Sequence, residues 1–269
     1  MYDYWSLSLP TDIENWPPGL LERSIDTVFV RLTQEQATAL IATNSYGLEM
    51  RGEKEPEAAA EVLDELRLIL SNVISDRFPD GAFVRLGSQS PKDSFDGIIH
   101  GFKCHNGQRV LELLNDSERV YDDLALAKHH SYLPVLALRK WIDIADWQEF
   151  RSFVKNRKLA GISQYYYYDF YPRILPRIPE IEAAIREECG AVIPLLPADD
   201  MVVDFFVSEE NGRLKAKMVE INPFFRDTDP CLFDWDEDDF GAFEFRYVTE
   251  PPEKPDLTTL LCEKEDKPD

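Results

Sequence analysis

The spacing of apolar residues divides the chain into segments with two different periods. Alternation of apolar and polar side chains is typical of strands, whereas apolar side chains three and four positions apart indicate helices. The segments expected to form strands are Ile25–Leu32, Ala82–Leu86, Val135–Ile144, Glu149–Lys155, Lys158–Gln164, Met201–Val207 and Leu214–Asn222. The expected helices are Gln34–Thr43, Glu57–Ser75, Asp116–Lys128 and Pro179–Cys189. Thr33 followed by Gln36 is a helix-start signature.

The last two of these strands carry polar ligand groups in otherwise apolar surroundings. Asp204 interrupts the run Met201–Val207, and Glu220 and Asn222 project from one face of Leu214–Asn222 because they are two residues apart. A carboxylate in an apolar strand is costly unless something pairs with it. Two carboxylates and an amide oxygen suit Mg²⁺ with bound phosphates. The pattern therefore fits either a magnesium site or a hairpin whose acids are solvated at its rim.

The register of this hairpin decides whether the three side chains can share one ion. Asn211-Gly212 is the strongest local signal for a two-residue turn, which would pair Glu210 with Arg213. Continued along the strands, that pairing places Asp204 and Glu220 on opposite faces of the sheet. A shared site needs a longer loop or a bulge of one residue. We predict that the turn signal is overridden and that the three side chains converge on one face.

Two basic residues lie in or beside the loop that follows Ala82–Leu86. The loop Gly87–Ser94 holds Lys92 among small hydroxyl residues, and Arg85 belongs to the preceding strand. Such a loop can cradle phosphate through backbone N–H groups and charge-assisted hydrogen bonds. The G-x-x-x-x-G-K-[ST] phosphate loop is absent, so an ordinary turn is the alternative. We expect Arg85 and Arg151 to lie across a cleft from the three proposed metal ligands.

A polar patch is expected where a tight turn joins Glu149–Lys155 to Lys158–Gln164. In the simplest register, Glu149 lies opposite Gln164 and Arg151 shares their face. This patch either contacts a ligand or is a solvated face of the sheet.

Composition limits the class of protein further. The chain has 269 residues with 44% hydrophobic content, enough for one large core or two lobes. Its formal net charge is −22, from 29 Lys and Arg against 51 Asp and Glu. That charge disfavours nucleic acid and anionic membrane as partners, but it allows a local basic pocket and would suit a basic protein. The four cysteines have no paired spacing, which argues against a disulfide framework or a zinc site.

No apolar run approaches the ~20 residues that cross a membrane, and no signal peptide is visible. We therefore expect a cytosolic protein. Prolines and charges dominate Glu250–Asp269, which we expect to be a disordered acidic tail.

Three blocks of sequence, in their order and spacing, carry a family resemblance. They are FVRLGSQSPKDS at Phe83–Ser94, LRKWIDI and EFRSFVKNRKLAGISQ within Leu138–Gln164, and VVDFFVSEENGRLKAKMVEINPFFRDTDPCLFDW at Val202–Trp235. IDTVFVRLTQEQATAL near the N-terminus adds to them. Together they resemble the cell division cycle protein 123 (D123) family, over most of the chain in outline. The last two blocks are specific, since many positions agree within each.

The D123 family resembles the wider ATP-grasp superfamily, in which two α+β lobes hold Mg-ATP between them. The resemblance implies an α+β, ATP-grasp-like fold, with two lobes of mainly antiparallel sheets enclosing a nucleotide cleft. It divides the chain into an N-terminal lobe at 1–134, a C-terminal lobe with the metal-binding hairpin at 135–249, and the tail at 250–269.

The resemblance also gives the candidate residues roles toward Mg²⁺ and phosphate. Asp204, Glu220 and Asn222 match the family's Mg²⁺ ligands, although family members commonly have Asp where this chain has Glu220. Lys92 matches the basic residue of the family's serine-proline-basic-aspartate motif. Arg85 falls where eukaryotic members tend to have Lys beside the phosphates, so the phosphate geometry here should differ.

The remaining candidates are expected around the adenosine part of ATP. Glu149 and Arg151 match the family's E-F-R motif, which implies contacts to ribose or phosphate. The residues of the strand expected to run past the adenine are Arg139, Lys140, Trp141 and Ile142.

Two classes of function follow from the resemblance. In eukaryotes, D123 proteins are assembly chaperones for translation initiation factor 2 and act on its gamma subunit, which implies an ATP-dependent protein with a protein partner. ATP-grasp enzymes instead phosphorylate a carboxylate and let an amine attack the acyl phosphate. The alternative is therefore a carbon-nitrogen ligase, and the sequence does not reveal a pocket for its second substrate.

Overall fold

The first sheet joins strands that are far apart in the sequence. The structure, a computed structural model, describes residues 4–54 and 56–252. In this sheet β3 (Val135–Lys140) lies between β1 (Thr27–Arg31) and β2 (Ala82–Leu86) and pairs with both in antiparallel register. The sequence predicts that this central strand covers Val135–Ile144, but in the structure it ends at Lys140.

The second sheet has five strands in the order β7-β6-β4-β5-β8. Neighbouring strands are antiparallel except β5 and β8, which run parallel. The strands are β4 (Glu149–Lys155), β5 (Lys158–Gln164), β6 (Met201–Glu210), β7 (Arg213–Pro223) and β8 (Glu244–Arg246). The predicted α+β class with mainly antiparallel sheets is confirmed.

The β6–β7 hairpin keeps the two-residue turn that its sequence favours. Asn211 and Gly212 both have positive φ, 52° and 74°, and Glu210 pairs with Arg213. The prediction that this turn is overridden is wrong, because an Asn-Gly pair adopts the left-handed turn at little cost and its twist matches the strands. The register changes farther along, at a one-residue bulge formed by Val219 in β7.

β5 also contains a one-residue bulge, which shifts its register against β4. Gln164 consequently lies opposite Phe150 instead of Glu149. It is fully buried, and its amide nitrogen donates to the backbone oxygens of Tyr166 and Asp169 at 2.6 and 2.7 Å. The predicted polar patch therefore lacks Gln164, because the bulge moves this residue to the other face of the sheet.

The expected helices are present, and several additional short ones connect them. The α-helices of the described residues are α1 (Tyr4–Ser8), α2 (Pro18–Arg23), α3 (Gln34–Thr43), α4 (Ser45–Arg51), α5 (Glu57–Arg77), α6 (Phe95–His100), α7 (Gly107–Asn115), α8 (Glu118–His129) and α9 (Ile178–Val192). The 3-10 helices are Leu9–Thr11, Ile13–Asn15, Asp146–Gln148, Leu175–Arg177 and Ile193–Leu195. The bounds of α3 are as predicted, and Thr33 and Gln36 form the reciprocal capping box that fixes its start.

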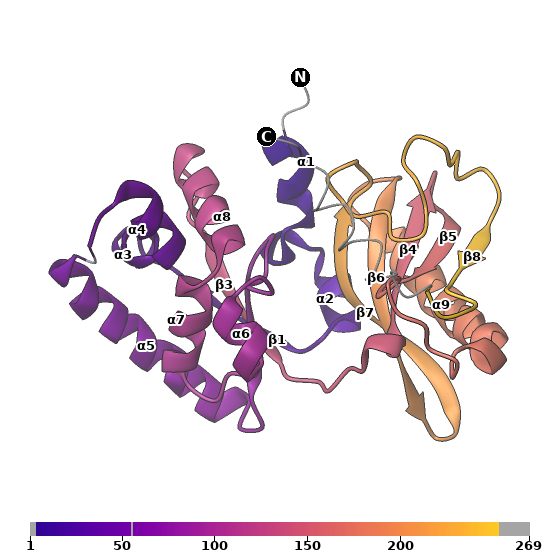
Figure 1. Ribbon diagram of the computed structural model, residues 1–269, viewed down its shortest axis with the longest axis horizontal. Coiled ribbons are helices and arrows are strands. Elements are labelled where there is room, and N and C mark those ends of the chain that lie inside the picture. Colours follow the sequence, from indigo (N-terminus) through magenta and orange to yellow (C-terminus); the bar gives the residue numbers. More distant parts are fainter. Residues whose placement is uncertain (1–3, 55, 253–269) are drawn as a thin grey trace, which may run out of the picture.

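Separate apolar cores lie on the two sides of the molecule (Figure 1). Helices α3, α5, α7 and α8 pack on one face of the first sheet, where Leu136 and Leu138 of β3 are fully buried. Helix α9 packs on one face of the second sheet, against Phe150 and Phe205. The N-terminal arm with α1 and α2 lies between the two halves, and its Leu20 belongs to the same core as α9.

Strand β3 connects the N-terminal part of the fold to the second sheet. The predicted boundary after residue 134 assigned this strand to the C-terminal lobe, but its pairing places it at the centre of the first sheet. Most of the predicted acidic tail, 253–269, lies outside the described residues. Among the described helices, none is both long and apolar enough to cross a membrane.

Candidate functional site

The bulge in β7 brings the three proposed metal ligands together. Beyond Val219, Asp204 of β6 lies directly opposite Glu220 of β7. Side chains opposed in this way share a face, with Cβ atoms roughly 5 Å apart. Asn222 donates its Nδ2 to Asp204 Oδ2 at 3.1 Å, which leaves its Oδ1 as the oxygen able to bind a cation. The three side chains therefore converge on one face, as predicted.

Arg151 is the direct partner of Asp204. Its Nε donates to Asp204 Oδ1 and its Nη2 to Asp204 Oδ2, both at 2.8 Å, and the two side chains are only 6% and 3% exposed. The expectation that Arg151 lies across the cleft is wrong. β4 pairs with β6, so Arg151 stands opposite Asp204 in the same sheet.

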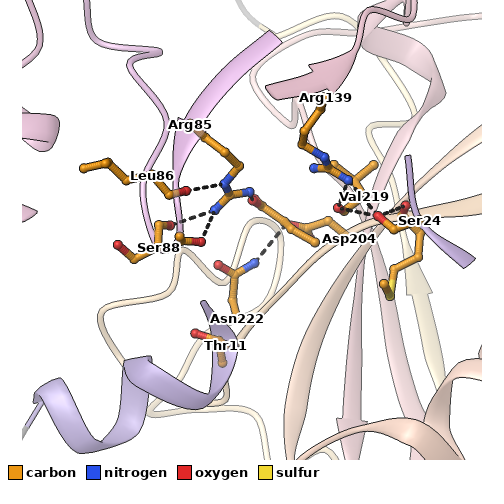
Figure 2. Close-up of polar contacts among 12 residues, drawn as sticks. Thr11, Ser24, Arg85, Leu86, Ser88, Arg139, Asp204, Val219 and Asn222 are labelled. Carbon is orange, nitrogen blue, oxygen red and sulfur yellow. Dashed lines mark hydrogen bonds and ion pairs between the residues drawn. The ribbon is translucent and has the colours of Figure 1, made fainter. Parts of the chain in front are cut away.

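Arg85 does lie across the cleft, and it holds Glu220 from the first sheet. Its Nη1 forms an ion pair with Glu220 Oε2. Its other nitrogens donate to backbone oxygens at the end of β2 and in the loop that follows, at 3.0 Å to Leu86, 3.3 Å to Gly87 and 2.8 Å to Ser88 (Figure 2). The planar guanidinium is thus fixed in one orientation between the loop and the second sheet.

Lys92 supplies a positive charge that the described carboxylates do not pair with. Among residues 4–54 and 56–252 it forms no ion pair, and its Nζ lies 5.6 Å from the centre of the Tyr165 ring. Its charge nevertheless reaches Glu220, where it helps to lower the pKa of the carboxyl group. Lys92 is therefore placed to meet an anion brought in from outside.

Burial raises the pKa values of the acids in the site, and the surrounding cations lower them. Burial alone would raise the pKa of Glu220, but Arg85, Lys92 and Arg151 outweigh it and lower the pKa to about 2. Burial raises the pKa of Asp204, and the charge and hydrogen bonds of Arg151 oppose that rise. Glu220 is thus ionised at neutral pH, the state required of a cation ligand.

A cavity of about 440 Å³ opens beside these charges. Arg85, Lys92, Asp204 and Glu220 lie at one part of its wall, while Phe83, Phe102, Trp141, Ile142 and Ile144 supply apolar surface. Glu149 lines it too, and burial raises the pKa of its carboxyl group. A wall with one charged part and one apolar part suits a ligand that carries both phosphate and an aromatic base.

The predicted adenine strand meets this cavity with its end and with the loop that follows. Arg139, Lys140, Trp141 and Ile142 all line the cavity. The backbone N–H groups of Lys140 and Trp141 are already used, at 2.8 Å to Asp26 O and 3.0 Å to Gly81 O. The N–H of Ile142 has no backbone partner among the described residues, which makes it the candidate donor to a base edge.

The residues of the site fit a divalent cation and a nucleotide. Asp204, Glu220 and Asn222 offer oxygen atoms, which Mg²⁺ prefers. Within the described ranges, no cluster of three or more His, Cys, Asp or Glu side chains has metal-site geometry. Water and phosphate oxygens would therefore have to complete the coordination shell that these two carboxylates and the amide begin. Buried Arg139 also has an Nε with no hydrogen-bond partner among those residues, a donor available to a polar ligand.

A second cavity, of about 520 Å³, shares Arg85, Lys92 and Glu220 with the first. It is also lined by Arg119 and Asp123 of α8 and by the loop that follows β7. The sequence does not reveal this cavity, because its lining comes from segments more than 100 residues apart that only the fold brings together.

Sequence reasoning missed Ser24 and Val219, which shape the site without contacting a ligand directly. The signal for Val219 is a change in apolar spacing along β7. Met218 and Ile221 are both buried in one core although they are three residues apart, whereas regular alternation would place them on opposite faces. No local signal marks Ser24, whose partners Met218 and Val219 lie almost 200 residues away.

A family profile and individual relatives from the same family both match this chain. The profile of the D123 family matches residues 24–265. A translation initiation factor eIF2 assembly protein from Candida albicans is 33% identical over 168 residues, which are 58% of this chain and 48% of the relative. A protein of the same name from Xenopus laevis is 29% identical over 82% of this chain and 63% of its own length. The chain thus spans about half the length of the first of these relatives and under two thirds of the second.

Among solved structures, that of Cdc123 from Schizosaccharomyces pombe resembles this chain in fold. The TM-score is 0.72 at 21% sequence identity, and the alignment covers 91% of this chain and 98% of the other. The similarity extends over most of the chain, so its fold is a known one.

Proposed function

The chain belongs to the D123 family, and on that premise we propose that it binds Mg-ATP between its two sheets and acts as an assembly chaperone for a protein partner. The observation that carries the nucleotide site is the convergence of Asp204, Glu220 and Asn222 beside Arg85 and Lys92. Asp204 and Glu220 line the first cavity, which has apolar walls, and Glu220 and Asn222 line the second. Among the three cavities described here, the first combines Asp204 and Glu220 with the apolar side chains of Phe83, Trp141 and Ile142.

Each part of the site has a distinct task in this proposal. Asp204, Glu220 and Asn222 hold the cation, which neutralises phosphate charge when it is bound. Lys92 and Arg85 meet the phosphate oxygens, and the fixed guanidinium of Arg85 also keeps Glu220 in place. Trp141 and Ile142 pack against the base, and Arg151 orients Asp204 and opposes the rise that burial causes in the pKa of its carboxyl group.

Calorimetry of ATP binding tests the nucleotide site. We expect binding in the presence of Mg²⁺ and its loss in excess chelator, because the phosphates and the two carboxylates repel each other without the cation. Lys128→Met on α8 removes a lysine that lines neither of the two cavities and serves as a control for a loss of charge.

The names of the relatives support a role in assembling translation initiation factor 2. The chain covers only part of their length, so this role is a proposal for the present chain. Where the source is eukaryotic, the partner is expected to be the gamma subunit. The test is a binding measurement with the purified subunit, with and without Mg-ATP. An ATP-dependent complex supports the proposal, and the absence of binding under both conditions contradicts it.

The second cavity supports one alternative, a carboxylate-amine ligase that forms an acyl phosphate. This cavity shares Arg85, Lys92 and Glu220 with the nucleotide cavity, so a second substrate held there would lie beside the phosphates. ADP release that depends on an added carboxylic acid and amine distinguishes the ligase from a chaperone, whose ADP release would depend on the protein partner.

A further inference from the structure

Two side-chain donors, Arg139 Nη2 and Ser24 Oγ, meet the backbone of β7 where the bulge forms. Arg139 Nη2 donates to the carbonyl oxygen of Val219 at 2.8 Å and to Ser24 Oγ at 2.7 Å. Ser24 Oγ lies 3.1 Å from the carbonyl oxygen of Met218 and 3.2 Å from that of Val219 (Figure 2). Arg139 and Ser24 are 2% and 3% exposed, so solvent cannot take over these bonds.

Val219 needs such partners because it is the extra residue of the bulge. Phe205 pairs with Met218 and Asp204 pairs with Glu220, which leaves Val219 without an opposite residue in β6. β7 is also the last strand of the sheet, so no second strand is available to it. A buried carbonyl without a donor is destabilising, and the guanidinium and hydroxyl groups remove that penalty.

The bulge sets the face on which Glu220 lies. Leu214 and Met218 point into the core that also contains Phe205. If regular pairing continued from Met218, Glu220 would stand opposite Val203, whose side chain is in the same core. The extra residue reverses the alternation, so that Glu220 faces Arg85 and Asp204 instead.

We propose that Arg139 and Ser24 are positioning residues that hold the Val219 bulge and thereby keep Glu220 opposite Asp204. The proposal rests on the proposed function of Glu220 and Asp204 as cation ligands. Arg139 belongs to β3 of the first sheet and Ser24 follows α2 in the N-terminal arm, so both reach the bulge from outside the second sheet. The affinity of the second sheet for a cation therefore depends on its contacts with the first sheet and with the N-terminal arm.

Ser24→Ala is the sharpest test, because Ser24 does not line the nucleotide cavity and its side chain contacts the bulge carbonyls and Arg139. We expect the Mg²⁺ concentration that supports half-maximal ATP binding to rise at least fivefold. Ser24→Thr keeps the hydroxyl and should restore the requirement to within twofold of the original protein. Ser152→Ala is the matched control, since Ser152 is fully buried in β4 of the same sheet and pairs with Val203 rather than with the bulge.

Amide hydrogen exchange gives a readout that requires neither metal nor nucleotide. In Ser24→Ala, the amides of Val219 and Glu220 should exchange at least tenfold faster than in the original protein, whereas those of α5 should keep their rates and report that the fold is intact. Arg139→Met should have the same local effect, and Arg139→Lys, which keeps a donor, a smaller one.

The outcomes separate this inference from the proposed function. Faster exchange at the bulge without any Mg-ATP binding by the original protein would contradict the proposed function but support the role of Ser24 and Arg139 in the bulge. Unchanged exchange at Val219 and Glu220 in both Ser24→Ala and Arg139→Met would overturn the inference, as would an Mg²⁺ requirement in Ser24→Ala equal to that of Ser152→Ala.

Discussion

Met218 and Glu220 stand two residues apart in β7, yet their side chains lie on opposite faces of the sheet. Met218 is fully buried in the core under α9, whereas Glu220 forms an ion pair with Arg85 across the cleft. A regular strand would place both on one face, so the Val219 bulge lets one strand build a core and a polar site in succession.

The first prediction concerns the buried ion pair of Arg151 and Asp204. Asp204→Asn should lower the free energy of unfolding by about 3–5 kcal/mol, because it leaves a buried guanidinium without its charged partner. Chemical denaturation measures the change. The control is Asp199→Asn, which breaks the exposed pair with Arg157 and should cost less than about 1 kcal/mol. Equal effects of the two substitutions would show that the pair in the site adds no more stability than one in solvent.

The second prediction concerns Lys92. Lys92→Met should weaken Mg-ATP binding about tenfold or more, because the lysine meets phosphate without a competing carboxylate partner. The melting temperature should change little, since the side chain is exposed and forms no ion pair among the described residues. If Lys92→Met bound Mg-ATP as tightly as Lys128→Met does, Lys92 would not be part of the phosphate site.

The third prediction concerns Trp141, which lines the apolar part of the nucleotide cavity. If a base packs on its ring, addition of Mg-ATP should change the tryptophan fluorescence of the protein. Trp141→Phe should abolish most of that change. Trp147→Phe, outside the cavity lining, serves as the control and should retain it. A full fluorescence response in Trp141→Phe would place the base elsewhere.

The fourth prediction is a pH dependence that arises from Asp12 of the N-terminal arm. Asp12 is 5% exposed, and burial together with Glu14 and Asp123 raises the pKa of its carboxyl group to about 8 against the opposing charge of Arg85. The unfolded pKa is about 4. The contribution of this group to stability is therefore fully present below about pH 4 and is lost as the pH rises through about 8.

Asp12→Asn removes this titration and tests it. The variant should be more stable than the original protein at pH 8, by about 1–3 kcal/mol, and its stability should fall less between pH 5 and pH 8. Denaturation at several pH values measures both effects. The exposed Asp227→Asn is the control. A variant that is less stable than the original protein at pH 8 would show that the ionised carboxylate is favourable where it lies.

Local sequence signals were sufficient for much of the fold. The capping residues Thr33 and Gln36 fixed the start of α3, and Asn211-Gly212 fixed the β6–β7 turn. These signals work because the residues that form the structure are adjacent in the chain. Of the two ways to bring the carboxylates onto one face, a longer loop or a one-residue bulge, the structure has the bulge, so the prediction of a different turn is wrong.

Parts of the site that depend on distant residues were less predictable. The family resemblance brought Asp204, Glu220 and Arg85 together, and the structure confirms that they are neighbours. It did not reveal that Arg151 would pair with Asp204 in the same sheet, which depends on the β4–β6 register. It also gave no role to the side chain of Arg139, because its partner is a backbone carbonyl exposed only by the bulge.

The most direct test of the central claim is the dependence of ATP binding on Mg²⁺ in the original protein and in Glu220→Gln. Gln keeps the size of Glu220 but removes the charge that faces Arg85 and the cation. Calorimetry should show Mg-ATP binding by the original protein, none in excess chelator, and an Mg²⁺ requirement at least tenfold higher in Glu220→Gln. Equal ATP affinity with Mg²⁺ and with chelator, or a Glu220→Gln variant with an unchanged Mg²⁺ requirement, would contradict a shared cation site at Asp204 and Glu220.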